Sequence, residues 1–173
     1  MDSVMPMEKT DASAREAFSE LLERHRAIVF KVANTYCRHP DDRADLVQDI
    51  AAQLWRAWPG YDPTRSFTTW MYRVALNVGI DFVRSHVREQ RHAVPLDEDL
   101  HDLADGQATD HESAQLLRLL HGFIDRQPPL DRALLLLYLD ERPQREIAEI
   151  LGISETNVST KIGRLKQRIR DEL

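Results

Sequence analysis

The stretch EIAEILGISETNVSTKIGRLKQRIR, residues 146–170, determines what the C-terminal part of the chain can fold into. Its apolar residues recur at steps of three and four, which is the spacing of amphipathic helices. The spacing is interrupted at Gly152, Ile153 and Ser154. Glycine suits the end of a helix, and serine suits the cap that begins the next one. The sequence therefore predicts a helix over residues 144–151, a corner with Ile153 turned inward, and a second helix.

The second of these helices has two unlike faces. The face opposite its apolar stripe carries small polar residues. Residues 156–170 hold five basic residues and no acidic one. Small polar groups can contact base edges while cations contact phosphates, so this layout is typical of a DNA recognition helix. A helical hairpin with a solvated basic face is the alternative for the motif taken alone. The stripe that we expect to be buried consists of Val158, Ile162, Leu165 and Ile169.

The charge of the whole chain contrasts with that basic helix. The 173 residues have a formal net charge of −6 and a pI near 5.6, and 42% of them are hydrophobic. This content can form the core of one medium domain or two small ones. An acidic chain is not attracted as a whole to nucleic acid or to an anionic membrane. Any surface that binds DNA must therefore be local.

Three further features indicate a cytoplasmic protein. The single cysteine, Cys37, cannot form an internal disulfide, which suits a reducing compartment. No apolar run approaches the ~20 residues that a membrane span needs. The N-terminal residues lack the basic and apolar blocks of a secretory signal. We therefore expect no membrane contact by this chain itself.

Upstream of the opening stretch, the apolar spacing is helical throughout, without strand alternation. Helices are predicted over residues 12–38, 41–58 and 67–91, separated by Pro40 and by a loop rich in Pro and Gly at 59–65. The third helix is apolar on two sides, which predicts a central position in a bundle. Between those sides runs a polar seam, with Trp70 at its edge: Arg73, Asn77, Asp81, Arg84 and Arg88.

Residues 93–112 differ in composition from the rest of the chain. They hold seven acidic residues, no Lys or Arg, and no clear apolar period, which predicts a flexible acidic linker. Helices over residues 113–126 and 130–139 then lead into the opening stretch. The expected fold is all-α, with two small helical domains over residues 12–92 and 113–173, the second containing a helix–turn–helix.

Three stretches together resemble the extracytoplasmic-function (ECF) group of the sigma-70 family of bacterial RNA polymerase sigma factors. They are DDRADLVQDIAAQLWRAW (41–58), SFTTWMYRVALNVGIDFVRSHVR (66–88) and LDRALLLLYLDERPQREIAEILGISETNVSTKIGRLKQRIR (130–170). The resemblance covers residues 12–172 and rests on all three stretches in this order and spacing. It implies a protein that binds core RNA polymerase and directs promoter-specific initiation, with sigma-2-like and sigma-4-like domains joined by the acidic linker.

The resemblance also implies roles for residues of the first domain. The second predicted helix would dock on the polymerase clamp through Asp45, Leu46, Gln48, Asp49 and Gln53. The loop and helix that follow would open and recognise the minus-ten element through Tyr61, Arg65, Ser66, Arg73, Asn77, Asp81, Arg84 and Arg88. A structural alternative exists for Asp81, and also for Trp70, which lies beside this set. Trp70, beside this set, is more typical of a core residue than of a base-stacking one, and Asp81 could pair with Arg84 or Arg88.

In the second domain, the resemblance implies recognition of the minus-thirty-five duplex. The residues concerned are Arg145, Thr156, Asn157, Ser159, Thr160, Lys161 and Arg164. Family members commonly carry a basic residue at the position of Ser159, which indicates a distinct promoter preference here. The linker acids could mimic a phosphate chain inside a polymerase channel, or could serve as a solubilising spacer. Many relatives are held inactive by an anti-sigma factor, which would be a third partner beside polymerase and promoter DNA.

Other classes of function fit less well. The sequence has no HExxH motif, paired Cys ligands, phosphate-binding Gly loop or nucleophile elbow, so we expect no catalytic residue, no metal and no cofactor. A loose group of His residues surrounds the linker, between His86 and His121. A stand-alone helix–turn–helix regulator and a sigma-like decoy that binds only a protein partner stay as alternatives. Basic residues on both expected DNA faces argue against the decoy.

Overall fold

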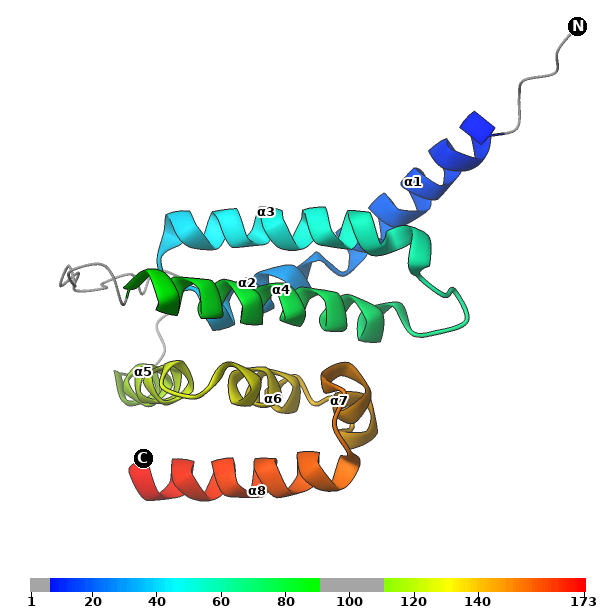
Figure 1. Cartoon of the computed structure of the whole chain (residues 1–173). Coiled ribbons are helices and arrows are strands. Elements are labelled where there is room, and N and C mark those ends of the chain that lie inside the picture. Colours follow the sequence, from blue (N-terminus) through cyan, green and yellow to red (C-terminus); the bar gives the residue numbers. More distant parts are fainter. Residues whose placement is uncertain (1–6, 91–110) are drawn as a thin grey trace, which may run out of the picture.

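The computed structural model describes residues 7–90 and 111–173, and the side chains of 11–87 and 111–173. Within these ranges the regular structure is helical and contains no strand, as predicted. Figure 1 shows the order of the elements along the chain. They are α1 (Met7–Arg24), α2 (Arg26–Tyr36), α3 (Pro40–Ala57), the short 3-10 helix η1 (Trp58–Gly60), α4 (Phe67–Gln90), α5 (His111–Asp125), α6 (Pro129–Leu139), α7 (Gln144–Leu151) and α8 (Glu155–Glu172).

The first predicted helix, over residues 12–38, is in fact two helices. α1 ends at Arg24 and α2 begins at Arg26, because His25 leaves the helical conformation with φ −112° and ψ 16°. The His25 ring packs against Phe67, with 5.5 Å between the ring centroids. Neither Pro nor Gly marks this break, and the apolar spacing continues across it, so no local pattern predicts it. Beyond the break, α1 projects away from the body of the molecule (Figure 1).

The first domain is a helical bundle in which α4 is central. α4 packs against α2 and α3, and its residues Met71, Tyr72 and Leu76 are buried. Three residues of α3 are fully buried in the core: Leu46, Ile50 and Leu54. Pro40 is the first residue of α3, where a missing N–H costs nothing, and two aspartates follow in the first turn.

The predicted helix–turn–helix is confirmed as α7 and α8. Gly152 ends α7 in the left-handed region with φ 67°, where a side chain would be strained. The hydroxyl of Ser154 accepts a hydrogen bond of 3.1 Å from the Asn157 N–H, so Ser154 is the N-cap of α8. Three members of the predicted stripe, Val158, Ile162 and Leu165, are buried, and the fourth is half-buried.

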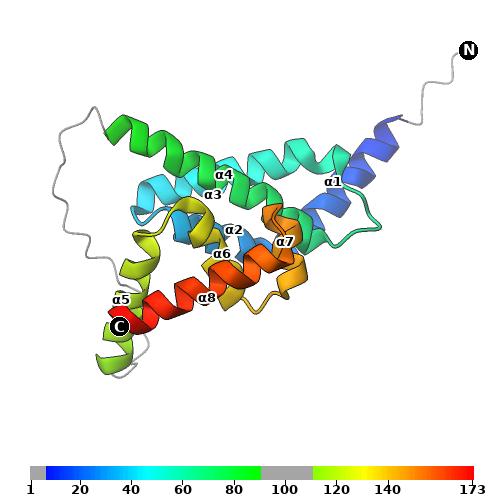
Figure 2. The ribbon, with the colours of Figure 1, turned by 60° about the horizontal axis from the view of Figure 1, so that its bottom comes forward.

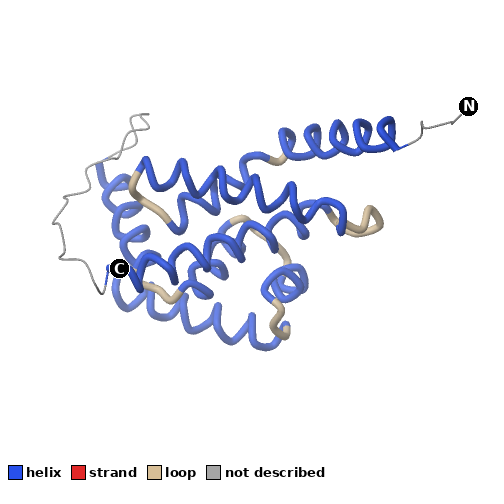
Figure 3. The backbone as a smooth tube through the Cα atoms, turned by 45° about the horizontal axis from the view of Figure 1, so that its top comes forward, coloured by secondary structure: helices blue, strands red, loops and turns tan. Residues whose placement is uncertain are grey.

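The two domains pack against each other. α2 and α4 of the first domain contact α6 and α7 of the second, while α8 lies on the far side of the second domain. Figure 2 shows the same packing after rotation, with α6 next to α2 and α7 next to α4. Figure 3 shows that the described part of the chain consists of helices joined by loops. Most of the predicted acidic linker lies outside the described residues. Its last two residues, His111 and Glu112, are the first residues of α5.

Two absences concern the described part of the chain. None of its helices combines the length and the apolar character that crossing a membrane requires. Residues 7–90 and 111–173 also bring together no set of three His, Cys, Asp or Glu side chains that could hold a metal ion. Two of the histidines around the linker, His92 and His101, lie outside the described residues.

Candidate nucleic-acid and polymerase interfaces

The outer face of α3 carries most of the residues expected to dock on polymerase. Asp45, Gln48, Asp49 and Gln53 are all exposed, and their spacing places them on one side of the helix. Leu46 differs from them because its side chain is fully buried in the core. It presents no surface to a partner in this structure, so any contribution to docking is through the position of α3.

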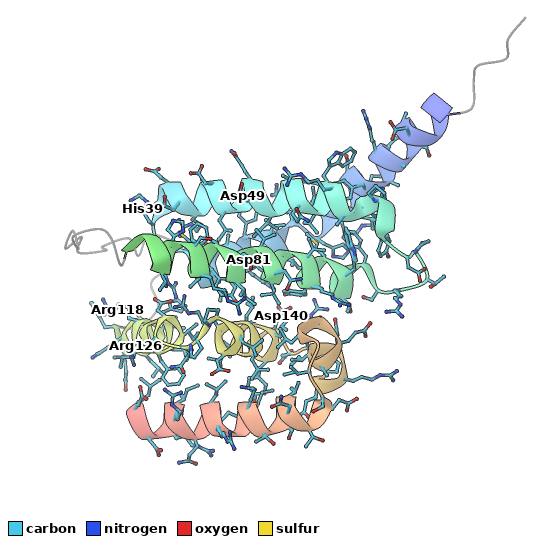
Figure 4. All side chains as sticks on the ribbon, viewed as in Figure 1. His39, Asp49, Asp81, Arg118, Arg126 and Asp140 are labelled. Atoms are coloured by element: carbon cyan, nitrogen blue, oxygen red, sulfur yellow. The ribbon has the colours of Figure 1, made fainter. Side chains whose placement is uncertain are left out.

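A groove of about 550 Å³ lies between the side chains of α3 and α4. Its polar lining includes Asp49 and Gln53 from α3, and Asn77 and Asp81 from α4. The rest of its lining comes from α4 and consists of the apolar Val74, Val78 and Phe82 and the polar Ser85 and His86. Figure 4 labels Asp49 and Asp81 on the two neighbouring helices. The fold therefore brings part of the predicted polymerase set next to part of the predicted minus-ten set.

The polar seam predicted for α4 exists as a line of exposed side chains. Arg73, Asn77, Asp81 and Arg84 are all exposed and follow one another at steps of four, four and three residues. The side chain of Arg88 lies outside the described residues. Among the ion pairs that the described side chains form, none joins Asp81 to Arg84. Both groups are available to a ligand in this structure.

An aromatic cluster holds the loop that precedes α4. The ring of Tyr61 stacks on Trp58 at 5.2 Å and lies 5.1 Å from the ring of Trp70. Trp70 is half-buried in this cluster and also packs against Phe67 at 5.5 Å. This position agrees with a mainly structural role for Trp70. The cluster fixes where the loop leaves the bundle.

Side-chain hydrogen bonds determine the shape of the same loop. The Tyr61 hydroxyl donates to the carbonyl of Arg65 at 2.9 Å. Asp62 accepts from the Thr64 hydroxyl at 2.7 Å and from its N–H at 2.9 Å, and these bonds lower the pKa of Asp62. Ser66 accepts a long bond of 3.4 Å from the Thr69 N–H at the start of α4. The loop is therefore ordered before any DNA arrives.

Arg65, at the end of this loop, contacts the second domain. Its guanidinium lies 3.7 Å from the Glu149 carboxylate of α7. Both side chains are exposed, so the pair contributes little stability. It nevertheless places an acidic residue of the helix–turn–helix beside a residue predicted to contact minus-ten DNA.

The residues predicted for minus-thirty-five recognition mostly lie on the exposed face of α7 and α8. Arg145, Thr156, Asn157, Ser159, Thr160 and Arg164 are all exposed. Lys161 is different: it is half-buried, and its ammonium lies 3.7 Å from Asp131 of α6. Asp131 therefore neutralises part of the charge of Lys161 within the second domain. Between Thr160 and Arg164, Gly163 faces open space, since a Cβ atom added there would meet no atom within 4 Å.

Two parts of the chain match described protein regions. Residues 21–89 match Sigma-70 region 2, and residues 117–169 match Sigma-70, region 4. The ECF RNA polymerase sigma factor SigM of Bacillus subtilis is 30% identical over 129 residues, which cover 73% of this chain and 76% of SigM. The ECF sigma factor SigE of Mycolicibacterium smegmatis is 28% identical over 165 residues, covering 94% of this chain but only 64% of SigE.

The fold is also similar to a solved sigma factor structure. That structure contains the sigma factor RpoE in complex with the anti-sigma factor NepR from Bartonella quintana. The TM-score is 0.73 at 16% identity, and the match covers 90% of this chain and 96% of the other. At this identity, the likeness concerns the fold alone.

A region 2 domain followed by a region 4 domain defines a sigma factor of the sigma-70 family, and this chain belongs to that family. Within the family, it belongs to the extracytoplasmic-function group, to which SigM and SigE belong by name. Sigma factors are initiation factors and not enzymes: they bind core RNA polymerase and direct transcription from promoters.

Proposed function

We propose that this chain binds core RNA polymerase through the exposed face of α3 and recognises promoters with two separate surfaces. The minus-ten surface consists of the loop at 61–66 and the seam of α4. The minus-thirty-five surface consists of α8 and the start of α7. The observation that carries the proposal is the exposed line of Arg73, Asn77, Asp81 and Arg84 beside an ordered loop.

The two surfaces suit different states of DNA. Strand opening requires that unstacked bases find hydrogen-bond partners while cations neutralise the backbone nearby. Asn77 and Asp81 line the groove and can contact base edges, while Arg73 and Arg84 can contact phosphates. On α8, small polar side chains face outward together with Arg164, which suits the major groove of an unopened duplex.

An acidic chain can serve in this role because the polymerase supplies most of the affinity. The net charge of −6 then disfavours binding of free protein to DNA, while the local cations act once the polymerase has positioned them. This function places the chain in the cytoplasm. We also propose regulation by an anti-sigma factor, supported by the fold shared with RpoE, which was solved with NepR. The acidic linker as a phosphate mimic stays a prediction.

The test is transcription by core RNA polymerase from a fragmented genomic library, with and without this chain. New start sites that share two spaced motifs are expected. Arg84→Glu should abolish starts by weakening minus-ten binding, and Arg164→Glu should do so through the minus-thirty-five element. Arg15→Glu is the control, because Arg15 lies on α1, outside all three proposed surfaces, where it pairs with Asp11 at 3.2 Å.

The outcomes separate the alternatives. A protein that binds core polymerase but starts no transcript would be a decoy. If both charge reversals leave transcription unchanged, the assigned DNA surfaces are wrong. Binding of promoter duplex by the free protein at physiological salt, as tight as that of the polymerase complex, would favour the stand-alone regulator.

A further inference from the structure

Gly163 lies near the middle of α8, at a position where glycine weakens the helix. Glycine is among the poorest helix formers, because its backbone loses the most freedom when the helix forms. A left-handed backbone would justify the residue, but Gly152 alone among the described glycines has a positive φ. The backbone conformation of α8 therefore does not require glycine at position 163.

No packing contact within the described chain requires it either. A Cβ atom added to Gly163 would meet no atom of the described residues within 4 Å. Gly79 is the opposite case, because a Cβ atom there would come within 2.5 Å of Cδ2 of Tyr36. At Gly79 the missing side chain allows two helices to pack, whereas at Gly163 it leaves the backbone of α8 bare towards the outside.

The bare position belongs to the face of α8 that we assign to minus-thirty-five DNA. Thr156, Thr160 and Gly163 follow one another at steps of four and three residues, which places them on one line along the helix. All three are exposed, as is Arg164 beside them. The side chains on this line are short at the two threonines and absent at Gly163. The next residue on the line, Gln167, has a long side chain again.

This profile suits a helix that lies deep in the major groove. The groove is about 12 Å wide, and a helix with its side chains is about 10–12 Å across, so there is little spare room. A side chain that points at the groove floor holds the helix axis away from the bases. The hydroxyls of Thr156 and Thr160 are short, so they reach base edges only when the backbone of α8 is close.

DNA fits this face better than another protein helix does. Close helix–helix contact also uses small residues, but it buries apolar side chains from both partners. The exposed residues between positions 155 and 168 of α8 include no apolar side chain. They include Arg164, directly beside Gly163, which can contact a phosphate or a base.

We propose that Gly163 is a positioning residue for minus-thirty-five DNA. Its missing side chain lets the backbone of α8 approach the base-pair edges, which brings Thr160 and Arg164 within reach of the DNA. This inference rests on the proposed minus-thirty-five surface. It gives two effects of opposite sign: a side chain at position 163 strengthens the free helix and weakens promoter binding. A residue that served only the fold would not separate these two effects.

Gly163→Ala and Gly163→Leu test the proposal, because alanine and leucine are both better helix formers than glycine. Each should raise the thermal midpoint of the free protein by about 2–4 °C. With core polymerase, Gly163→Ala should bind a promoter from the transcription library about ten-fold more weakly, and Gly163→Leu more weakly still. When the minus-thirty-five element of that promoter is scrambled, both variants should bind it as well as the unchanged protein does.

Gly122→Ala on α5 is the matched control. Gly122 is also inside a helix of the second domain, and a Cβ atom there would meet Nη1 of Arg126 at 3.5 Å, an ordinary contact. This variant should raise the thermal midpoint too, but it should leave binding to both promoters unchanged. Equal loss of promoter binding in Gly122→Ala and Gly163→Ala would mean that a stiffer domain, and not the clearance at Gly163, weakens binding. That result overturns the proposal.

Two further outcomes also overturn it. One is unchanged binding of Gly163→Ala to a promoter on which the unchanged protein depends on the minus-thirty-five element. The other is weaker binding of Gly163→Ala to core polymerase without DNA, which would assign this face to a protein partner. If the unchanged protein binds the intact and the scrambled promoter equally, the proposed minus-thirty-five surface is itself wrong. That failure is visible without any variant, so it is distinct from a failure at Gly163.

Discussion

Gly79 of α4 lies directly against the ring of Tyr36 on α2. A Cβ atom built on Gly79 would come within 2.5 Å of Cδ2 and 2.9 Å of Cε2 of that ring. Tyr36 is 5% exposed, and burial raises the pKa of its phenol above the ordinary range. Its hydroxyl crosses to the second domain by bonding the Pro129 carbonyl. One glycine therefore determines both how closely α2 and α4 approach and where a bridging tyrosine points.

Gly79→Ala should destabilise the protein, although alanine is the better helix former. The helix gains about 1 kcal/mol from the substitution, but inserting a methyl group into a packed core typically costs about 1–3 kcal/mol. The Tyr36 ring cannot move aside cheaply, because it is buried and bonded at its far end. Urea unfolding followed by circular dichroism would measure the change.

Gly163→Ala is the matched control, since Gly163 is also inside a helix but has open space around it. It should stabilise the free protein by up to about 1 kcal/mol. If both alanines stabilise the protein equally, the close approach of Gly79 to Tyr36 is not a real constraint.

Ser154→Ala should weaken α8 by about 1 kcal/mol, because it removes the side chain that accepts from the Asn157 N–H. The loss should be visible as faster amide exchange in the first turn of α8. Ser159→Ala is the control, since Ser159 is exposed and does not cap the helix. Equal loss of protection in both variants would contradict the capping role.

Arg164 and Lys161 should contribute unequally to minus-thirty-five binding. Arg164 is exposed, so Arg164→Ala should cost about 1–3 kcal/mol of binding if it contacts a base. Lys161→Ala should cost less, because Asp131 already neutralises part of its charge at 3.7 Å. Binding of the polymerase complex to promoters with intact and scrambled minus-thirty-five elements would show this.

Removing the Asp131 carboxylate should increase the contribution of Lys161 to promoter binding. Asp131→Asn should strengthen promoter binding and make its salt dependence steeper, because one more cation becomes available to phosphate. In the double variant Asp131→Asn with Lys161→Ala, that gain should vanish. A gain that persists without Lys161 would mean that Asp131 acts by another route.

Acidification should weaken the packing of the two domains through His121 on α5. Burial and the nearby charge of Arg38 lower the pKa of His121 below its ordinary 6.5, and Asp125 only partly opposes them. When the domains separate, Arg38 moves away and that pKa rises. The packed arrangement of the two domains thus loses stability as the pH falls below 6.5, until the pH reaches the lowered value.

The measurement is the radius of gyration between about pH 7.5 and about pH 5.5, where ordinary carboxyl groups stay ionised. His121→Gln should remove the His121 part of any expansion. If the radius of gyration increases equally in the unchanged protein and in His121→Gln, other groups cause the pH response.

Much of the fold could be predicted from local patterns. The Gly152–Ser154 corner, the buried stripe of α8 and the core residues of α3 follow from spacing and capping, which involve residues within a few positions of one another. The exposed seam of α4 was also predictable, because a helix that is apolar on two sides leaves a polar line between them. The order and spacing of the three motif stretches then indicated the sigma-70 family.

Other features depend on partners far away in the sequence. The break at His25 reflects a contact with Phe67. The pairing of Lys161 with Asp131 likewise cannot be predicted from the sequence around either residue. That pairing changes what Lys161, a residue predicted to contact DNA, can do.

The helices, the helix–turn–helix and the sigma-70 membership can all be inferred from the amino-acid sequence, because they depend on local periodicity and ordered motifs. The closure of the two domains on each other is visible only in the folded chain. Hydrogen bonds between the domains join residues 87 and 109 positions apart, as in Arg38 with Asp125 and Lys31 with Asp140. No short-range pattern encodes such pairs, since each side chain alone looks like an ordinary surface charge until folding places its partner opposite.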